Sequence, residues 1–385
     1  HGHPHPVLYS LFMNLTILNH RSGLQTIAQS WRASLLVCFL FFGLMFPLSA
    51  QTNSSSNNLS EYVNPFVGTG GHGHTFPGAA SPFGMVQLSP DTRIDDSWDG
   101  CGGYHYDDSF IYGFSHTHLS GTGVSDYGDV LMMPTGGPRS IMPSFNPKNY
   151  RSNYNHSSEV AEAGYYSVYL PAYEIKAELT VTPHVGIHRY TYYQSFDRSK
   201  FTAKVLIDLN HRDYVISHRM EQLDQHRIGG WRQSKAWANN QWVFFVIEFS
   251  QDISRIITAQ DGRKMVVEFD MGYSDANSGS GNASANPSKY GEGHLCEIVA
   301  KVGISFTSEA GAIANLNAEM MGDKSFNDYR AMAKQAWNEE LSKIQVTSDY
   351  EARTFRVGAQ SVKTDVEKRK FYTALYHCMI HPSLA

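Results

Sequence analysis

The segment IKAELTV, residues 175–181, places an apolar side chain at every second position, at Ile175, Ala177, Leu179 and Val181. A period of two is typical of a β-strand that buries one face. The same alternation, or a dense apolar run, recurs at residues 201–209, 242–249, 264–269 and 298–306. Turn-forming residues rather than helical segments separate these stretches. The sequence therefore predicts an antiparallel β-sandwich and a mainly β fold, not a parallel sheet with crossover helices.

The overall composition also favours a β-rich globular protein. Of the 385 residues, 42% are hydrophobic, and 22 Tyr and 21 Phe are present, so the chain can hold two or more domains. The formal net charge of −5, without a long basic run, argues against a nucleic-acid surface. Only four cysteines occur and none forms a CxxC motif, so the sequence indicates neither a disulfide framework nor structural zinc.

An apolar run near the N-terminus has the features of a secretory signal. Residues 34–50, SLLVCFLFFGLMFPLSA, follow Arg21 and Arg32 and end in the small residues Ser49 and Ala50. The run is shorter than the roughly 20 residues that cross a bilayer, which favours a cleaved signal over an uncleaved anchor. We therefore expect a leader at residues 1–50, a polar tether at 51–60, a periplasmic or secreted protein, and no stable membrane span in the mature chain.

Beyond the strands, the period of the apolar residues changes from two to 3.6. One helical face is predicted to hold Phe326, Tyr329, Ala333, Trp337, Leu341 and Ile344. Ser325 and Asp328 form a capping-box pattern at its start, which predicts a helix of about 20 residues. A second helical stretch at residues 362–380 has an apolar face that needs other helices to bury it. We expect a β-sandwich domain at residues 61–312, a helical linker at 313–347 and, at 348–385, the start of a helical domain belonging to a longer protein.

The segment from Asn64 to Gly136 concentrates glycine, histidine, aspartate and single aromatic residues. Apart from short strands predicted at residues 85–88 and 130–133, it indicates loops that build a site. Its sharpest part is residues 98–106, WDGCGGYHY, where glycines follow a tryptophan. Such a ring can stack on the C–H face of a sugar while Asp99 and His105 bond its hydroxyls. The alternative is a core tryptophan followed by a turn.

Two His-x-His pairs in this segment allow a different interpretation. The pairs are His72 with His74 and His116 with His118. Residues i and i+2 of a strand project from one face, so these pairs could form a metal-dependent hydrolase site together with Asp126 or Asp129. We favour the alternative that these histidines bond backbone groups and hold the glycine-rich loops in shape.

Four segments together resemble glycoside hydrolase family 92, the bacterial exo-acting α-mannosidases. They are YVNPFVGTGGHGHTFPGAASPFGMVQLSPDTR at 62–93, WDGCGGYHY at 98–106, GFSHTHLSGTG at 113–123 and FYTALYH at 371–377. The resemblance implies an N-terminal β-sandwich, a helical linker and a C-terminal (α/α)6 barrel, of which residues 348–385 would be the truncated start. It also implies calcium as cofactor, mannose-containing glycans as substrates with terminal α-linked mannose, foremost α-1,2, and an inverting mechanism. Such a mechanism uses two carboxyl groups about 6.5 to 9.5 Å apart.

The resemblance divides the site between the two domains. It places the catalytic carboxylates and the calcium ligands in the barrel, so we assign no catalytic residue and no metal ligand in this chain and expect the chain alone to be inactive. It assigns to the sandwich a share of the substrate pocket, formed by Gly70, Gly71, His72, His74, Trp98, Asp99, Cys101 and Gly102. Trp98 is expected to touch the sugar beyond the scissile bond. The alternative is a carbohydrate-binding module without catalysis.

Overall fold

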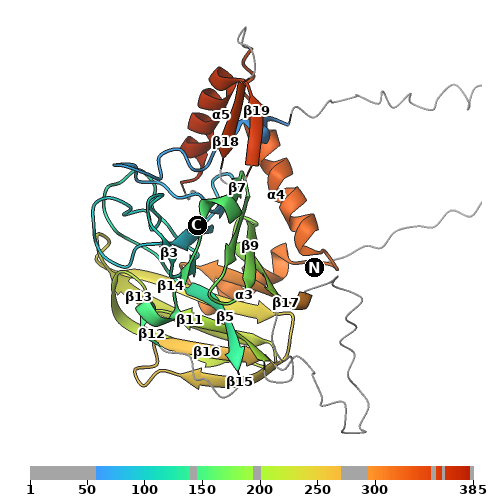
Figure 1. Ribbon diagram of the computed structural model, residues 1–385. Coiled ribbons are helices and arrows are strands. Elements are labelled where there is room, and N and C mark those ends of the chain that lie inside the picture. Colours follow the sequence, from blue (N-terminus) through green and yellow to red (C-terminus); the bar gives the residue numbers. More distant parts are fainter. Residues whose placement is uncertain are drawn as a thin grey trace, which may run out of the picture. The chain divides into compact units, whose positions relative to one another are not determined.

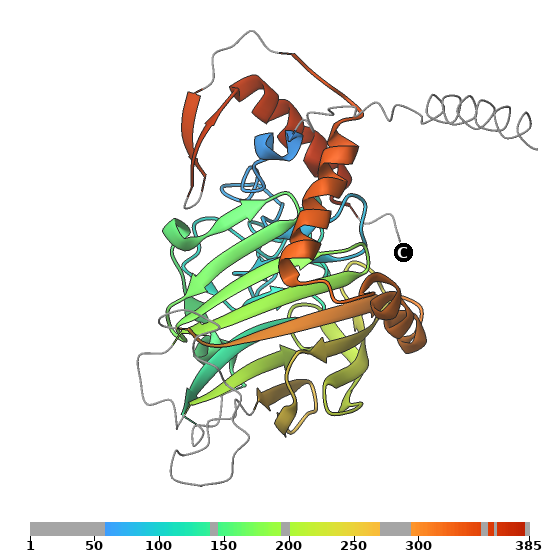
Figure 2. The same ribbon diagram turned by 90° about the vertical axis from the view of Figure 1, so that its right-hand side faces the viewer.

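Two antiparallel sheets make up most of the structure, as the alternating segments predict (Figures 1 and 2). The computed structural model describes residues 58–138, 145–193, 201–269, 294–347, 353–357 and 360–381, all within one compact unit. In this part of the chain, one sheet has seven strands in the order β1 (Ala79–Ala80), β2 (Gln87–Asp91), β4 (Gly113–Ser115), β5 (Leu131–Pro138), β11 (Phe201–Asp208), β16 (Lys264–Phe269) and β15 (Ile253–Thr258). The other described sheet has eight strands in the order β12 (Tyr214–Gln222), β13 (Arg227–Lys235), β14 (Gln241–Phe249), β17 (His294–Ser305), β10 (Val185–Tyr193), β9 (Ile175–Val181), β8 (Tyr165–Leu170) and β7 (Val160–Glu162).

One large apolar core draws side chains from both sheets. The four alternating residues of β9, from Ile175 to Val181, are buried in it together with Val205 and Ile207 of β11. Full burial of such a side chain contributes roughly 1.5 to 3 kcal/mol before entropy is counted. The period of two in the sequence therefore corresponds to the face that each sheet turns toward the core, and the antiparallel, mainly β fold class is confirmed.

The predicted strands are found, with small differences at their ends. β9 and β16 have the predicted bounds, and β11, β14 and β17 overlap the predicted runs. The expected strand at 85–88 begins two residues later, as β2. Strand β10, with the sequence VGIHRYTYY, was missed, because the buried polar residues His188 and Thr191 interrupt its apolar alternation.

Helix α3 (Glu309–Glu319) packs against strands of the eight-stranded sheet. It continues past residue 312, where the sandwich domain was expected to end. Ala312 and Leu316 of α3 are buried with Val185 and Ile187 of β10. The close approach requires a glycine on the neighbouring strand, because a Cβ at Gly303 would lie 2.6 Å from the carbonyl oxygen of Ala312. The first helical element therefore belongs to the surface of the sheet.

Helix α4 (Phe326–Leu341) follows the predicted helical face. Both hydrogen bonds of the expected capping box between Ser325 and Asp328 are present. Phe326, Tyr329, Ala333, Trp337 and Leu341 are buried on one side. The helix has 16 residues rather than about 20, and Ile344, which lies past its end, is 48% exposed.

The C-terminal described residues form a hairpin and a helix. The strands β18 (Arg353–Val357) and β19 (Gln360–Thr364) pair with each other, and helix α5 (Val366–Met379) begins after Asp365, whose carboxylate accepts hydrogen bonds from Glu367 N and Lys368 N. The predicted helix at 362–380 is therefore wrong at its first residues. α5 buries Tyr372, Tyr376 and Met379 in a second apolar core.

This second core joins distant parts of the chain (Figure 2). It contains Trp337 of α4, Phe76 from the loop before β1, Ala80 of β1, and Leu59 of the short helix η1 (Leu59–Tyr62). Leu59 and Ser60 are thus buried, although they fall in the expected tether. The helical face of α5 is covered by α4 and η1 together with the loop that precedes β1.

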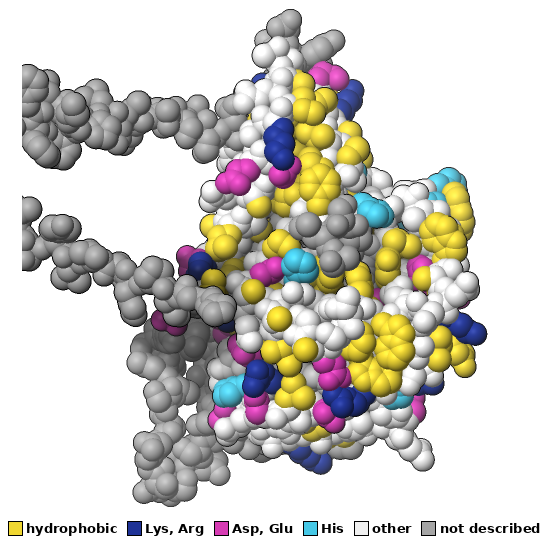
Figure 3. Space-filling view, turned by 180° about the vertical axis from the view of Figure 1, so that it is seen from behind, with side chains coloured by type: hydrophobic (Ala, Val, Ile, Leu, Met, Phe, Trp, Pro, Cys, Tyr) yellow, Lys and Arg dark blue, Asp and Glu magenta, His cyan; other side chains and the backbone are white. Residues whose placement is uncertain are grey.

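Several predictions from the sequence lie outside the described residues, among them the leader at 1–50 and most of the tether. Among the described helices, none is both long enough and apolar enough to cross a membrane. On the face shown in Figure 3, hydrophobic side chains form separate groups among polar and charged ones.

Candidate functional site

The three glycine-rich loops expected to build the site lie together. The Gly121 N–H donates to the carbonyl oxygen of His74 at 2.6 Å, and the carbonyl oxygen of Gly71 lies 3.0 Å from Nε2 of His105. A Cβ at Gly102 would lie 3.2 Å from the carbonyl oxygen of Leu119. The loops around residues 70, 100 and 120 are therefore held to one another by their own backbone.

Trp98 projects from these loops into solvent and is 58% exposed, so the core-tryptophan alternative is wrong. The ring of His74 meets it edge-on, with the ring centroids 4.2 Å apart. Gly123, at φ +70°, makes room for both rings, because a Cβ there would lie 3.1 Å from His74 Cε1 and 3.2 Å from Trp98 Nε1. The indole is therefore fixed in place while much of its surface stays free to contact a ligand.

Polar groups stand beside the indole. His72 Nδ1 lies 2.9 Å from Asp99 Oδ1, and this hydrogen bond lowers the pKa of Asp99. Nε2 of His74 is buried and has no hydrogen-bond partner among the described residues. Most buried polar atoms in folded proteins have a hydrogen-bond partner, so this nitrogen is an exception.

The remaining predicted site residues differ in exposure. Gly71 is exposed at φ +58° and Gly70 is partly buried beside Tyr106. Cys101 and Gly102 are buried beneath the loop. Burial raises the pKa of the Cys101 thiol, and its carbonyl oxygen accepts a hydrogen bond from Arg212. These two residues shape the loop from below.

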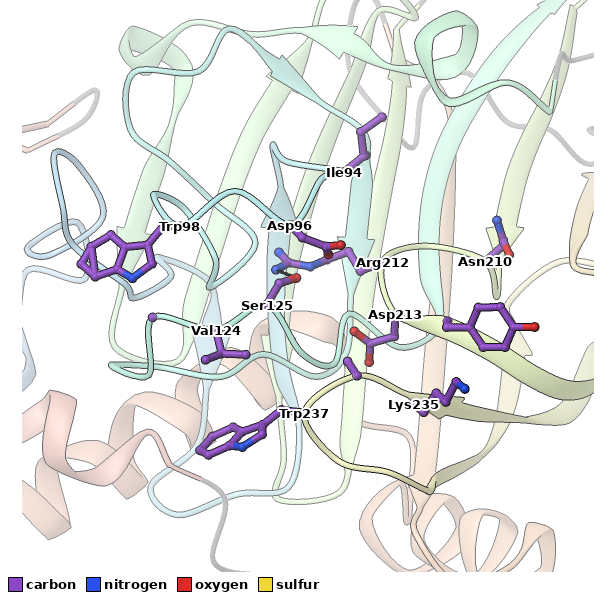
Figure 4. Close-up of a pocket in the computed structure, with 13 residues that line it drawn as sticks. Ile94, Asp96, Trp98, Val124, Ser125, Asn210, Arg212, Asp213, Lys235 and Trp237 are labelled. Carbon is purple, nitrogen blue, oxygen red and sulfur yellow. Dashed lines mark hydrogen bonds between the residues drawn. The ribbon is translucent and has the colours of Figure 1, made fainter.

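A pocket of about 660 Å³ adjoins Trp98 (Figure 4). The loops around Trp98 supply one part of its lining, and the segments at the start of β12 and at the end of β13 supply the rest. Its lining consists of Ile94, Asp96, Trp98, Gly123, Val124, Ser125, Asn210, Arg212, Asp213, Tyr214, Lys235, Ala236 and Trp237. The segments at 210–214 and 235–237 were missed by the sequence analysis, although the first combines Asn210 and Asp213 with an aromatic ring and the second contains Trp237.

Asp213 is the most perturbed carboxyl of this pocket. Burial, and after it the charge of Asp129, raises its pKa to about 8. The backbone N–H of Tyr127 lies 2.9 Å from Asp213 Oδ2 and 3.0 Å from Asp126 Oδ1. The backbone has positive φ at Tyr127 (+70°), Arg212 (+52°) and Asp213 (+23°), a region that costs energy for residues with a Cβ.

The second His-x-His pair lies in the core and bonds protein groups. His116 Nδ1–H donates to the carbonyl oxygen of Val130 at 2.7 Å, so its Nε2 accepts a hydrogen bond from His188 Nε2–H at 3.0 Å. His188 Nδ1 in turn accepts from the Tyr190 hydroxyl at 2.7 Å. Burial lowers the pKa of His116 to about 4, consistent with two neutral rings.

His118 belongs to a different buried cluster. Its Nδ1–H donates to the carbonyl oxygen of Gln87 at 2.8 Å, and its Nε2 lies 3.3 Å from Asp91 Oδ1. Burial alone would raise the pKa of Asp91, but His211 and His118 lower it well below its ordinary value. Ser115 completes the cluster by donating its hydroxyl to Asp91 Oδ2 at 2.6 Å.

The aspartates of the metal interpretation are also committed to protein groups. Asp129 is fully buried and forms an ion pair with Arg232. Asp126 accepts a hydrogen bond from the Ala238 N–H at 3.2 Å. Within the described ranges, no group of three or more His, Cys, Asp or Glu side chains is arranged to hold a metal ion. The arrangement of the four histidines thus differs from the one that the metal interpretation requires.

Comparison with known protein families identifies the family to which this fold and these loops belong. The sequence matches the glycosyl hydrolase family 92 N-terminal domain over residues 62–305 and the family 92 catalytic domain over residues 311–385. The chain therefore belongs to glycoside hydrolase family 92, as the four motifs predict. The second match begins inside α3, ahead of the boundary at 348 expected from the sequence.

Three relatives illustrate what the chain is similar to. A family GH92 α-mannosidase of Bacteroides thetaiotaomicron, solved in complex with mannoimidazole, is 32% identical with a TM-score of 0.67, over 84% of this chain and 40% of that chain. An inverting GH92 mannosidase of B. thetaiotaomicron VPI-5482 shares the fold, at 22% identity and a TM-score of 0.62, over 84% of this chain and 40% of that chain. An uncharacterized secreted glycosidase of Arthroderma benhamiae is 26% identical over 355 residues, 83% of this chain and 41% of the relative. The chain spans about two fifths of the length of each relative.

Proposed function

We propose that the full-length protein removes terminal α-linked mannose from glycans, with a preference for α-1,2 linkages and with inversion at the anomeric carbon. Membership of family 92 and similarity to an α-mannosidase support the reaction class. The observation that carries the proposal to this chain is Trp98, which is 58% exposed and held by His74 within family motifs. An exposed, immobilised indole is a typical surface for stacking a sugar ring.

The sandwich contributes binding groups. The Trp98 ring stacks on the sugar beyond the scissile bond, His74 holds this ring from the side, and the His72–Asp99 pair bonds hydroxyls of the substrate. Gly70 and Gly71 allow the backbone to approach the sugar closely. Cys101 and Gly102 support the loop beneath Trp98.

The hydrolytic step itself needs a general acid and a general base on opposite sides of the bond, with water between them. We assign neither role to a residue of this chain. Asp91 and Asp129 are buried and paired, and Asp99 is bonded to His72. We therefore propose that the chain ending at Ala385 is inactive by itself and that residues 311–385 begin the catalytic domain.

We also propose that the full-length protein requires calcium. Calcium binds six to eight oxygen ligands, several of them carboxylates. The carboxylates described in the sandwich do not fit this requirement, since no group of three such residues among them is arranged to hold a metal. The ligands would therefore come from other parts of the protein. Incubation with EDTA should abolish mannose release, and added calcium should restore it.

Mannose release from α-1,2-mannobiose by the full-length protein tests the main proposal. Proton NMR at early times should show β-mannose as the first product, as inversion requires. Trp98→Ala should lower kcat/KM about tenfold, the range of one aromatic contact, whereas Trp98→Phe should retain most of the activity. Absence of release from every α-linked mannobiose with calcium present would refute the proposal, and α-mannose as first product would refute inversion.

A carbohydrate-binding module is the second candidate, because the exposed Trp98 and the His72–Asp99 pair are both present in the sandwich. Titration calorimetry with the chain ending at Ala385 separates the two. Millimolar or tighter binding of mannobiose that Trp98→Ala removes favours the module, while undetectable binding favours a site completed by the second domain.

We further propose that the protein is periplasmic or secreted and that its leader is cleaved. The apolar run at 34–50 supports this, as does the description of the A. benhamiae relative as secreted. N-terminal sequencing of the exported protein should give Gln51 as the first residue.

A further inference from the structure

The pocket beside Trp98 extends to a second exposed tryptophan. Trp237 is 66% exposed and lines the same pocket as Trp98. In Figure 4 the two indoles lie at one side of the pocket with Val124 between them. Large exposed hydrophobic side chains are concentrated here, since five of them line this pocket: Ile94, Trp98, Val124, Tyr214 and Trp237.

The turn that carries Trp237 is fixed by hydrogen bonds on both sides. The Ala236 N–H donates to the carbonyl oxygen of Ala238 at 3.0 Å, and the Ala238 N–H donates to Asp126 Oδ2 at 3.2 Å. Gln233 Nε2 donates to Asn240 Oδ1 at 2.9 Å across the base of the turn. Because the backbone is already ordered, a ligand that stacks on Trp237 loses little free energy to ordering the loop.

Polar side chains line the rest of the pocket. Asp96, Asn210 and Lys235 are exposed at its walls, and Lys235 Nζ lies 5.0 Å from the centre of the Tyr214 ring. Aromatic faces together with hydroxyl-bonding groups match a sugar, which has apolar C–H faces and polar edges. The volume of about 660 Å³ is within the ordinary range of small-molecule sites.

We propose that this pocket binds the next sugar of the leaving group, the third from the non-reducing end, and that Trp237 is a specificity-determining residue for longer mannosides. The inference rests on the proposed α-mannosidase function, in which Trp98 contacts the second sugar. A glycan that continues past Trp98 toward Trp237 enters a preformed site. The full-length protein should then hydrolyse a linear α-1,2-mannotriose with a higher kcat/KM than α-1,2-mannobiose.

The test is the ratio of kcat/KM for the triose to that for the biose. Trp237→Ala should lower this ratio about fivefold, the range of one aromatic contact. Trp237→Phe keeps a ring and should hold the ratio within twofold of the original. Met321→Ala is the matched control, because Met321 is also 66% exposed but lies outside the pocket, and it should leave the ratio unchanged.

An unchanged ratio in Trp237→Ala would overturn the inference. This holds whether both rates stay the same, whether both fall equally, or whether the protein is destabilised because another protein segment covers the pocket. If the original protein releases no mannose from either sugar, the proposed function fails. The subsite is then tested by calorimetry with the same two oligosaccharides: weaker triose binding after Trp237→Ala supports it, and equal binding refutes it.

Discussion

The indole N–H of Trp337 donates to the carbonyl oxygen of Ala80 at 2.7 Å and so joins helix α4 to strand β1, which follows the first glycine-rich loop of the site. Trp337 is fully buried and packs on Tyr376 of α5, with the ring centroids 4.5 Å apart. One side chain therefore connects two helices to the sandwich, and the stability of the site loops depends on it.

Trp337→Ala should destabilise the protein by about 3 to 5 kcal/mol, because it leaves a cavity in the second core. Trp337→Phe fills most of this space but leaves the Ala80 carbonyl without its donor, at a cost of about 1 to 3 kcal/mol. Urea unfolding followed by circular dichroism measures both. Met332→Ala on the same helix removes a side chain that is 43% exposed and should change stability by less than about 0.5 kcal/mol. Equal effects at the two positions would contradict the packing described here.

Arg232→Ala should destabilise the protein by about 3 to 5 kcal/mol, because it leaves the carboxylate of Asp129 buried without its ion pair. The control is Arg227→Ala on the same strand, where the pair with Asp224 is exposed and contributes about 0 to 1 kcal/mol. Thermal unfolding of both variants checks the difference. A similar small loss at the two arginines would show that Asp129 is less buried than the structure indicates.

Gly123→Ala should lower the proposed mannosidase activity of the full-length protein more than Gly121→Ala does. Both glycines have positive φ, +70° and +79°, so both substitutions strain the backbone, by about 1 kcal/mol. Only at Gly123 does the added Cβ meet His74 and Trp98, and nothing lies within 4 Å of a Cβ at Gly121. We expect a fall in kcat/KM of about tenfold beyond that of the control, as for the loss of one aromatic contact. Equal falls in the two variants would mean that the position of Trp98 does not matter.

Asp213→Asn should make the thermal stability of the protein less sensitive to pH between pH 4 and 8. The pKa of Asp213 is raised from 3.8 to about 8 in the folded protein, chiefly by burial. Its contribution is fully present below pH 3.8 and is lost as pH rises toward 8, because the unfolded chain releases the proton first. The unfolding midpoint of the variant should therefore exceed that of the original protein by a margin that grows between pH 4 and 8. A margin that stays constant over this range would contradict the raised pKa.

His116 acts in the opposite direction. Burial lowers its pKa from 6.5 to about 4, so its contribution is present above pH 6.5 and is lost as pH falls toward 4. The His116→Gln variant should therefore lose less stability than the original protein when the pH falls from 6.5 toward 4. Unfolding midpoints at pH 4.5 and 7.5 report it, and the difference between the two should be smaller than in the original protein. An unchanged difference would show that His116 is already charged in the fold.

The sequence was most informative where one physical signal dominated. The alternation in 175–181 predicted both ends of β9 correctly, and Ser325 with Asp328 predicted the start of α4. Strand β10 was missed because His188 and Thr191 are buried with partners that only the folded chain provides. The helix predicted from residue 362 starts later because residues 362–364 pair with a strand that follows the linker region.

In the candidate site, residues close together in the sequence could be predicted and a distant one could not. Trp98, His72, His74 and Asp99 could be selected from a short glycine-rich stretch, since they lie close in the sequence and in space. Trp237 could not, because β13 and β14 bring it from more than a hundred residues away to the same pocket. Only the pairing of these strands reveals that proximity.

The hydrogen bond from Gln87 Nε2 to the carbonyl oxygen of Ile380 spans 293 residues of sequence. A ribosome must therefore translate as far as α5 before the helix that covers Phe76 and Ala80 exists. Until then the apolar side of the glycine-rich loops stays uncovered, and a chaperone that binds apolar segments of nascent chains would find its target there.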